Sequence, residues 1–141
     1  MKKRILFVDD DEDILFCYRM SLESENLTIY TAQDSESALD IVIHQKIDVA
    51  VLDYMMPGVK GDELAKLVGQ IDPRVKIYFV SGFDVALENV KRLNLSVYGV
   101  FMKPIEPDLI RKIAETEDYT SSVYQKLMSD LGNLYSNVYV E

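Results

Sequence analysis

Residues 49–58 read VAVLDYMMPG, and this stretch decides which fold the chain is expected to adopt. Its first four residues are all apolar, which is typical of a strand buried on both faces in a parallel sheet. The carboxylate of Asp53 follows at once, and Pro57-Gly58 supply turn residues. Open α/β sheets bind ligands beyond the carboxyl ends of their strands, so Asp53 is a candidate site residue.

The same pattern, an apolar run that ends in polar residues, recurs on both sides of this stretch. Strands are predicted over residues 3–8, 27–31, 47–53, 75–80 and 97–102. Helical spacing of apolar residues predicts helices over about 11–24, 34–44, 61–70, 85–93 and 107–115. Strands that alternate with helices indicate a parallel sheet covered on both faces. We therefore expect a flavodoxin-like (βα)5 doubly wound α/β fold with strand order 2-1-3-4-5.

Length and composition limit what the chain does. Its 141 residues, 48% hydrophobic and 28% charged, suit one globular domain with a short appendage. A net charge of −9 argues against direct binding of nucleic acid, which needs a basic surface. The single cysteine, Cys17, fits a reducing compartment, and its apolar neighbours predict a buried, inert thiol. No stretch has transmembrane length, so we expect a cytoplasmic protein without membrane contact.

Polar residues stand at four strand ends: Asp9 and Asp10 after the first, Asp53 after the third, Ser81 after the fourth and Lys103 after the fifth. In this strand order the first and third strands are neighbours, so their carboxylates meet and repel. Lys103 offsets one charge, and a hard divalent cation such as Mg²⁺ suits the remaining oxygen ligands. The carboxylates would leave some coordination positions of the Mg²⁺ ion open. These positions, together with the Ser81 hydroxyl and the Lys103 ammonium, favour a phosphate ligand.

The chain resembles the receiver domain of two-component response regulators over about residues 3–116. We therefore expect a receiver domain over residues 1–117 and an extension over 118–141. The residues that carry the resemblance are Asp9-Asp10, Asp53, Met56-Pro57, Gly61-Asp62-Glu63-Leu64, Ser81-Gly82 and Lys103-Pro104.

The resemblance implies a phosphoacceptor, not an ordinary enzyme. Asp53 would accept a phosphoryl group from the phosphohistidine of a histidine kinase or a histidine phosphotransfer protein. Lys103 would pair with Asp53 beforehand and with a phosphoryl oxygen afterwards, and Ser81 would move to donate a hydrogen bond to the phosphoryl group. The charge gained at Asp53 would then bias a two-state element and switch partner binding.

The resemblance also implies Mg²⁺ as cofactor. Asp10 and Asp53 would bind the ion directly, Asp9 would bind it through water, and the backbone carbonyl of Met55 would be a further ligand. This assignment agrees with the all-oxygen ligand set that Mg²⁺ prefers.

One position departs from the family pattern. Many receivers carry an aromatic residue three positions before the lysine, where this chain has Val100. Strand alternation points Phe101 to the other face, whereas Tyr98 shares the parity of Val100 and is a candidate substitute.

The extension carries an amphipathic pattern, with Val123, Leu127, Leu131, Leu134 and Val138 at helical spacing. It is expected to be a helix, a linker to an output domain, or a contact in a homodimer. Residues 136–141 are expected to be extended after Gly132. The chain is too short for a DNA-binding output domain, so its target is a downstream protein or a domain outside this sequence.

Two other functions compete with the receiver. The first is a receiver-like scaffold that acts without phosphorylation, against which the intact set of site residues argues. The second is a Mg²⁺-dependent phosphatase of the haloacid dehalogenase type, whose Asp-x-Asp element Asp9-Asp10-Asp11 resembles. That phosphatase motif has Thr or Val at the position where this chain has Asp13. Such phosphatases also carry a cap and further acidic loops, for which 141 residues leave little room.

Overall fold

The computed structural model describes residues 2–58, 60–81, 98–103, 105–115 and 138–140. The predicted helix over 85–93 lies outside these residues, as does the helical pattern of the C-terminal extension as far as Leu134. Val138, the last residue of that pattern, lies in a strand and not in a helix. The described elements are β1 (Lys3–Val8), α1 (Glu12–Leu22), β2 (Leu27–Ala32), α2 (Ser35–His44), β3 (Val49–Asp53), α3 (Gly61–Ile71), β4 (Lys76–Ser81), β5 (Gly99–Met102), α5 (Pro107–Glu115) and β6 (Val138–Val140). No described helix is both long and apolar enough to cross a membrane.

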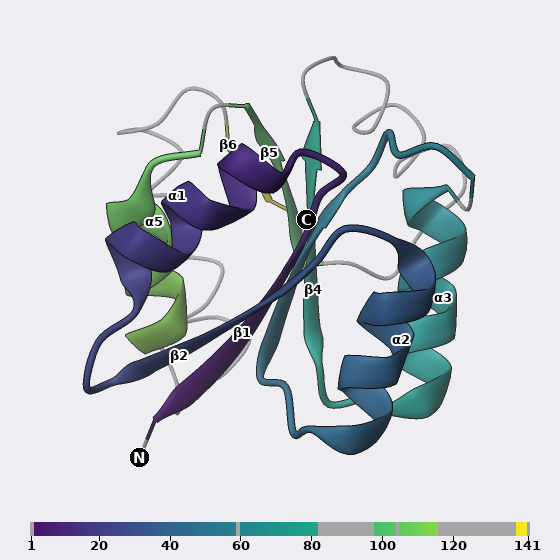
Figure 1. Ribbon diagram of the computed structural model, residues 1–141, viewed down its shortest axis with the longest axis horizontal. Helices are drawn as coiled ribbons and strands as arrows, with labels where there is room; N and C mark the ends of the chain where they lie inside the picture. Colours follow the sequence, from purple (N-terminus) through teal and green to yellow (C-terminus); the bar gives the residue numbers. More distant parts are fainter. Residues whose placement is uncertain (1, 59, 82–97, 104, 116–137, 141) are drawn as a thin grey trace.

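The sheet has the order β2-β1-β3-β4-β5-β6. Its first five strands are parallel, which confirms the predicted flavodoxin-like order 2-1-3-4-5. Figure 1 shows α1 and α5 on one face of the sheet and α2 and α3 on the other. The last strand, β6, pairs antiparallel with β5. Val138–Val140 are therefore extended, as expected for residues 136–141.

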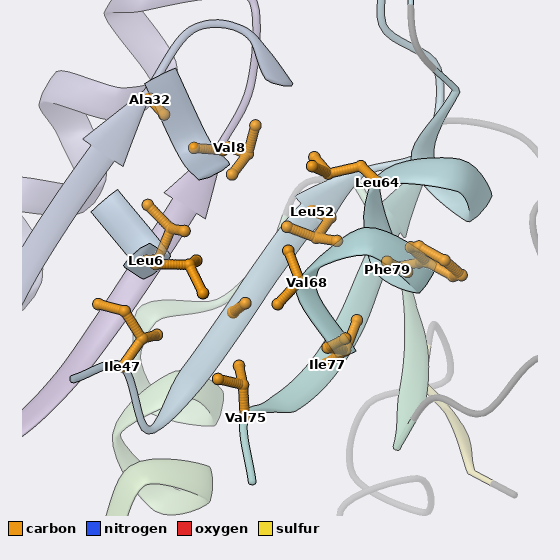
Figure 2. Close-up of a cluster of buried hydrophobic side chains, with 14 of the residues drawn as sticks. Leu6, Val8, Ala32, Ile47, Leu52, Leu64, Val68, Val75, Ile77 and Phe79 are labelled. Atoms are coloured by element: carbon orange, nitrogen blue, oxygen red, sulfur yellow. The ribbon is translucent and has the colours of Figure 1, made fainter. Parts of the chain in front are cut away.

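Strand alternation divides the core into two clusters. Figure 2 shows Leu6, Leu52 and Phe79 on the face that packs against α2 and α3. Their neighbours Phe7, Val51 and Tyr78 pack on the other face with residues of α1 and α5. Every residue of β3 is buried, as its unbroken apolar run predicts for a central parallel strand.

The exposed face of α1 corrects one prediction. Cys17 is exposed, not buried, and its neighbours Phe16 and Met20 are 62% and 69% exposed. Residues 14–18 are all apolar or aromatic, but consecutive helical residues point in directions 100° apart, so they do not share one face. Leu15 and Leu22 take the buried positions.

The side chains of β5 point to the two faces of the sheet as predicted, whereas that of Tyr98 does not. Val100 packs in the cluster that faces α2 and α3, and Phe101 packs in the opposite one. Tyr98 lies before the first residue of β5, and its ring centroid is 6.0 Å from that of Tyr78, which faces α1 and α5. The expectation that Tyr98 shares the face of Val100 is wrong, because strand alternation does not extend beyond Gly99.

Candidate functional site

The parallel register brings the predicted site residues to one edge of the sheet. Val8 pairs with Leu52 in β3, and Ser81 pairs with Met102 in β5. The residues at these strand ends, Asp9, Asp53 and Ser81, are 3%, 4% and 0% exposed. Two carboxylates and a hydroxyl in a buried position need polar partners.

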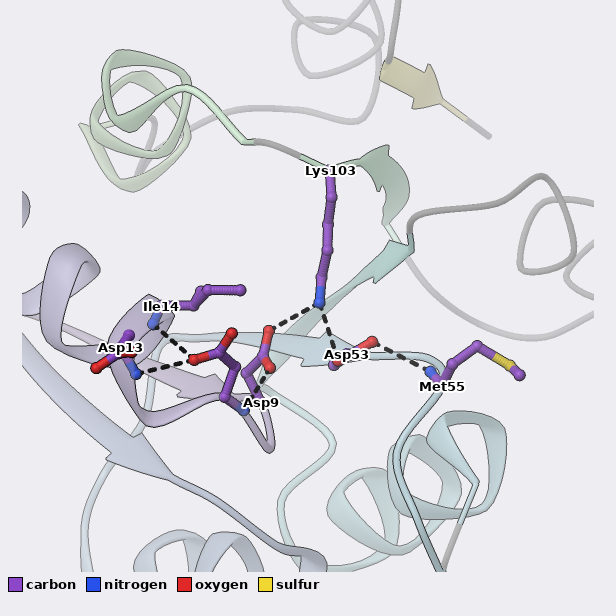
Figure 3. A network of polar contacts seen from close by, with 7 residues as sticks. Asp9, Asp13, Ile14, Asp53, Met55 and Lys103 are labelled. Atoms are coloured by element: carbon purple, nitrogen blue, oxygen red, sulfur yellow. Dashed lines mark hydrogen bonds and ion pairs between the residues drawn. The ribbon is translucent and has the colours of Figure 1, made fainter.

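Lys103 provides the cationic partner for both buried carboxylates. Its Nζ lies 3.0 Å from Asp9 Oδ2 and 3.0 Å from Asp53 Oδ2, as Figure 3 shows. The backbone N–H of Lys103 donates to the carbonyl of Ser81 at 2.8 Å, which holds the end of β5 against β4. The ammonium therefore bridges residues that are 94 and 50 positions away in sequence.

Local hydrogen bonds orient each carboxylate within its own loop. Asp53 Oδ1 accepts from the Met55 N–H at 3.1 Å, and Asp9 Oδ1 accepts from the Asp11 N–H at 2.9 Å. Asp11 itself caps α1, since its side chain accepts from the N–H groups of Asp13 and Ile14. Each buried aspartate thus keeps one oxygen on its own loop and directs the other toward Lys103.

The charges at this edge are only partly balanced. Burial raises the pKa of the Asp53 carboxyl above its ordinary value, and the charge of Asp9 adds to this, while hydrogen bonds from Lys103 and Met55 offset part of it. Burial lowers the pKa of the Lys103 ammonium, but hydrogen bonds to Asp9 and Asp53 outweigh burial and hold it above its ordinary value. One ammonium against a cluster of carboxylates leaves room for a further cation.

This imbalance predicts a pH-dependent effect of Asp53→Asn on stability. Because the pKa of Asp53 is raised on folding, the folded state binds the proton more tightly, and wild-type stability falls as pH rises through this pKa. Without Mg²⁺, Asp53→Asn should be more stable than wild type at pH 7, since Lys103 keeps its contact with Asp9. The difference in free energy of unfolding between the variant and wild type should shrink as pH falls toward about 4, the ordinary pKa of aspartate. Urea denaturation in EDTA at several pH values measures it, and a variant less stable at pH 7 would contradict it.

The carboxylates fit a hard cation. Asp9, Asp10 and Asp53 each bring an oxygen to within 4.8 Å of the others. Asp9 and Asp53 are buried, whereas Asp10 is exposed, so the cluster opens to solvent on one side. An all-carboxylate set with an open side suits Mg²⁺, which keeps several waters and is bound through one or two carboxylates.

Two features of the site were not anticipated. The ring of Tyr18 stacks on Phe7 with centroids 4.3 Å apart, and burial followed by the charge of Asp9 raises the pKa of its phenol to about 12. Gly61 starts α3 against the loop after Asp53, where an added Cβ would lie 2.7 Å from Tyr54 Cα. A glycine at a helix start is the sequence signal for this close approach, whereas nothing in the sequence marks Tyr18.

The comparison with known families identifies the class of protein. The profile of the response regulator receiver domain matches residues 5–115, and the chain belongs to this family. It is the receiver domain of a two-component response regulator, which is a phosphoacceptor rather than a classical enzyme. Its acidic cluster at Asp9, Asp10 and Asp53 is typical of the metal site of receivers.

Two curated relatives carry transcriptional or regulatory names. The alkaline phosphatase synthesis transcriptional regulatory protein PhoP of Bacillus subtilis is 34% identical over 107 residues, which are 76% of this chain and 45% of that protein. The nisin biosynthesis regulatory protein NisR of Lactococcus lactis is 30% identical over 139 residues, 94% of this chain and 60% of that protein. The chain thus spans about half the length of the curated relatives it matches.

Solved structures share the fold. A CheY-like receiver domain from Methanospirillum hungatei is 32% identical with a TM-score of 0.73, covering 82% of this chain and 93% of that one. A response regulator from Burkholderia pseudomallei, solved with a phosphorylated aspartic acid, calcium and citrate, has a TM-score of 0.75 at 16% identity. That likeness covers 94% of this chain and 75% of that one, and concerns the fold alone.

Proposed function

We propose that this receiver domain acts in the cytoplasm and takes a phosphoryl group from a phosphohistidine onto Asp53, and that the donor is a histidine kinase or a histidine phosphotransfer protein. The observation that carries the proposal is the buried Asp53 carboxylate, which lies 3.0 Å from the Lys103 ammonium beside the carboxylates of Asp9 and Asp10. Phosphoryl transfer needs positioning and charge neutralisation more than covalent chemistry from the protein, and this arrangement supplies both.

In this proposal Asp53 is the nucleophile, and Lys103 and Ser81 contact the oxygens of the phosphoryl group. An oxygen of the Asp53 carboxylate, which the Met55 N–H already orients, attacks phosphorus; the new P–O bond forms as the P–N bond of the phosphohistidine breaks, and the donor imidazole leaves. Lys103 then neutralises a phosphoryl oxygen, and the Ser81 hydroxyl at the end of β4 donates a hydrogen bond to another. Ser81 ends β4 and Lys103 follows β5, and the backbone hydrogen bond from Lys103 to Ser81 keeps the two residues together.

The proposed metal ligands are Asp10 and Asp53 directly, Asp9 through water, and the backbone carbonyl of Met55. When bound, Mg²⁺ would supply positive charge against the oxygens of the transferring group. Without the ion, burial and the charge of Asp9 raise the pKa of the Asp53 carboxyl, and the hydrogen bond from Lys103 offsets this only in part.

The domain is proposed to end near residue 117, with residues 118–141 as an extension that is a helix, a linker or a contact in a homodimer. The phosphorylated state is proposed to switch the binding of a downstream protein partner or the activity of an output domain. No direct contact with nucleic acid or membrane is proposed, in line with the net charge of −9.

Incubation with acetyl phosphate tests the proposal directly. With Mg²⁺ the intact mass of wild type should rise by one phosphoryl group, while Asp53→Asn and wild type in EDTA should show no gain. Asp40→Asn, an exposed aspartate on α2, is the matched control and should behave as wild type. A purified histidine kinase supplies a second donor. No gain with either donor would favour the scaffold, and steady phosphate release without gain would favour the phosphatase.

Metal binding should also stabilise the fold. A ligand present at 100 times its Kd stabilises the folded state by about 2.7 kcal/mol. We therefore expect saturating Mg²⁺ to raise the melting temperature of wild type and Asp40→Asn, and to have much less effect on Asp10→Asn. Thermal denaturation with and without Mg²⁺ measures the shift. An equal shift in Asp10→Asn would rule out Asp10 as a direct ligand.

A further inference from the structure

The outer edge of β5 carries an added strand. Among the described strands, β6 alone is antiparallel, and it lies beside β5 in Figure 1. Its register pairs Gly99 with Val140, Val100 with Tyr139, and Phe101 with Val138. Without β6, β5 would be the outermost of the described strands on that side of the sheet. An edge strand offers a row of N–H and C=O groups that recruits another strand.

The strand that receives β6 is also the strand that delivers Lys103 to the functional site. Val138 pairs with Phe101, only two residues before Lys103. The Lys103 N–H is held by the Ser81 carbonyl at 2.8 Å, and its Nζ contacts Asp9 and Asp53 at 3.0 Å. A change of charge at Asp53 acts on Lys103, and the backbone of β5 continues directly from it. The strand-binding edge and the site therefore share one element.

We propose that the outer edge of β5 is a binding site for an extended peptide segment, that β6 is its resident ligand, and that its occupancy is coupled to phosphorylation of Asp53. The coupling rests on the function proposed above. The segment that fits is an extended one of Val-Tyr-Val character, because the chain itself places such a segment there. In strand addition, main-chain hydrogen bonds supply the affinity.

The length of β6 makes it exchangeable. Three residues form few main-chain hydrogen bonds with β5, at one edge of the sheet. Because β6 belongs to the same chain as β5, its binding is intramolecular, and a partner's segment in trans has to compete with it. A shift of β5 on phosphorylation would change this competition, and by reciprocity a bound strand would change phosphorylation.

The first test uses the full chain with Val138→Pro and Tyr139→Pro together. Consecutive N–H groups of a strand point to opposite sides, so one of the two prolines removes a donor directed at β5. Hydrogen exchange of the amides of 99–102 should be faster in this variant and unchanged in Tyr139→Phe, which keeps the backbone. Equal protection in all three chains would overturn the pairing.

The second test adds the ligand in trans. A fluorescent peptide with the sequence of residues 136–141, SNVYVE, should bind saturably to the double-proline chain. Wild type, in which β6 competes from the same chain, should bind it about twofold or more weakly, the factor expected once β6 occupies the edge at least half of the time. A peptide carrying the two prolines should not bind. Absence of binding, or equal binding of both peptides, would overturn the strand site.

The third test separates the coupling from the proposed function. After treatment with acetyl phosphate and Mg²⁺, the Kd of SNVYVE for the double-proline chain should change by about fivefold or more, the range typical of allosteric coupling. The same chain with Asp53→Asn should show no change. A verified mass gain with unchanged Kd would overturn the coupling and leave the proposed function standing. Absence of mass gain would count against the proposed function and so remove the coupling, while the second test still decides the strand site.

Discussion

Replacing Lys103 with methionine is expected to slow phosphorylation of Asp53 by about 10²–10³-fold, the usual cost of removing one preorganised electrostatic contact from a site of charge transfer. Methionine keeps a similar length and removes the charge. Asp9 and Asp53 then lose the ammonium that lies 3.0 Å from each of them. The pKa of Asp53, already raised by burial, should rise further, and the transferring group loses its cationic partner.

The initial rate of mass gain with acetyl phosphate, at saturating Mg²⁺, measures this loss. Lys66→Met is the matched control, because Lys66 is exposed on α3, and it should phosphorylate like wild type. Lys103→Arg keeps the charge but not the compact ammonium, and is expected to fall between the two. A rate for Lys103→Met within threefold of wild type would mean that Lys103 only balances the resting carboxylates and takes no part in transfer.

The sheet and its polar edge could be predicted because both follow from local patterns. Residues 49–52 are uniformly apolar, a pattern that is typical of a central parallel strand buried on both faces. Once the strands are parallel, their carboxyl ends must share an edge, so Asp9, Asp53 and Lys103 were expected to meet across 94 residues of sequence. Within this group only Asp53 was expected to pair directly with Lys103. The additional ion pair between Lys103 and Asp9 was not predicted, because it depends on the reach of one side chain.

What could not be predicted depends on packing between elements. Residues 14–18 place apolar or aromatic side chains on every face of the helix. Only the contact of α1 with the sheet decides which of these faces, such as that of Cys17, becomes exposed. The position of Tyr98 depends on where pairing of β5 begins, which alternation cannot locate. The residues of β6 show β-propensity, but nothing local identifies β5 as their partner.

Gly61→Ala is expected to destabilise the protein by about 1–3 kcal/mol, the usual cost of overpacking a close contact. The new Cβ would lie 2.7 Å from Tyr54 Cα, 3.1 Å from the Tyr54 carbonyl oxygen and 3.2 Å from that of Asp53. All three atoms belong to the backbone, so no side chain can turn away to make room. The loop after Asp53 has to move instead, and it carries the Met55 N–H that orients the carboxylate.

Gly69→Ala is the matched control on the same helix. No atom lies within 4 Å of its added Cβ, and alanine in a helix interior is favoured over glycine by about 0.5–1 kcal/mol. The two substitutions make the same chemical change in α3 and should shift the free energy of unfolding in opposite directions, which urea denaturation measures. Phosphorylation should slow in Gly61→Ala alone, because only that substitution displaces the loop. If both variants were stabilised, α3 would not lie tightly against Tyr54, and this loop would not depend on the helix for its position.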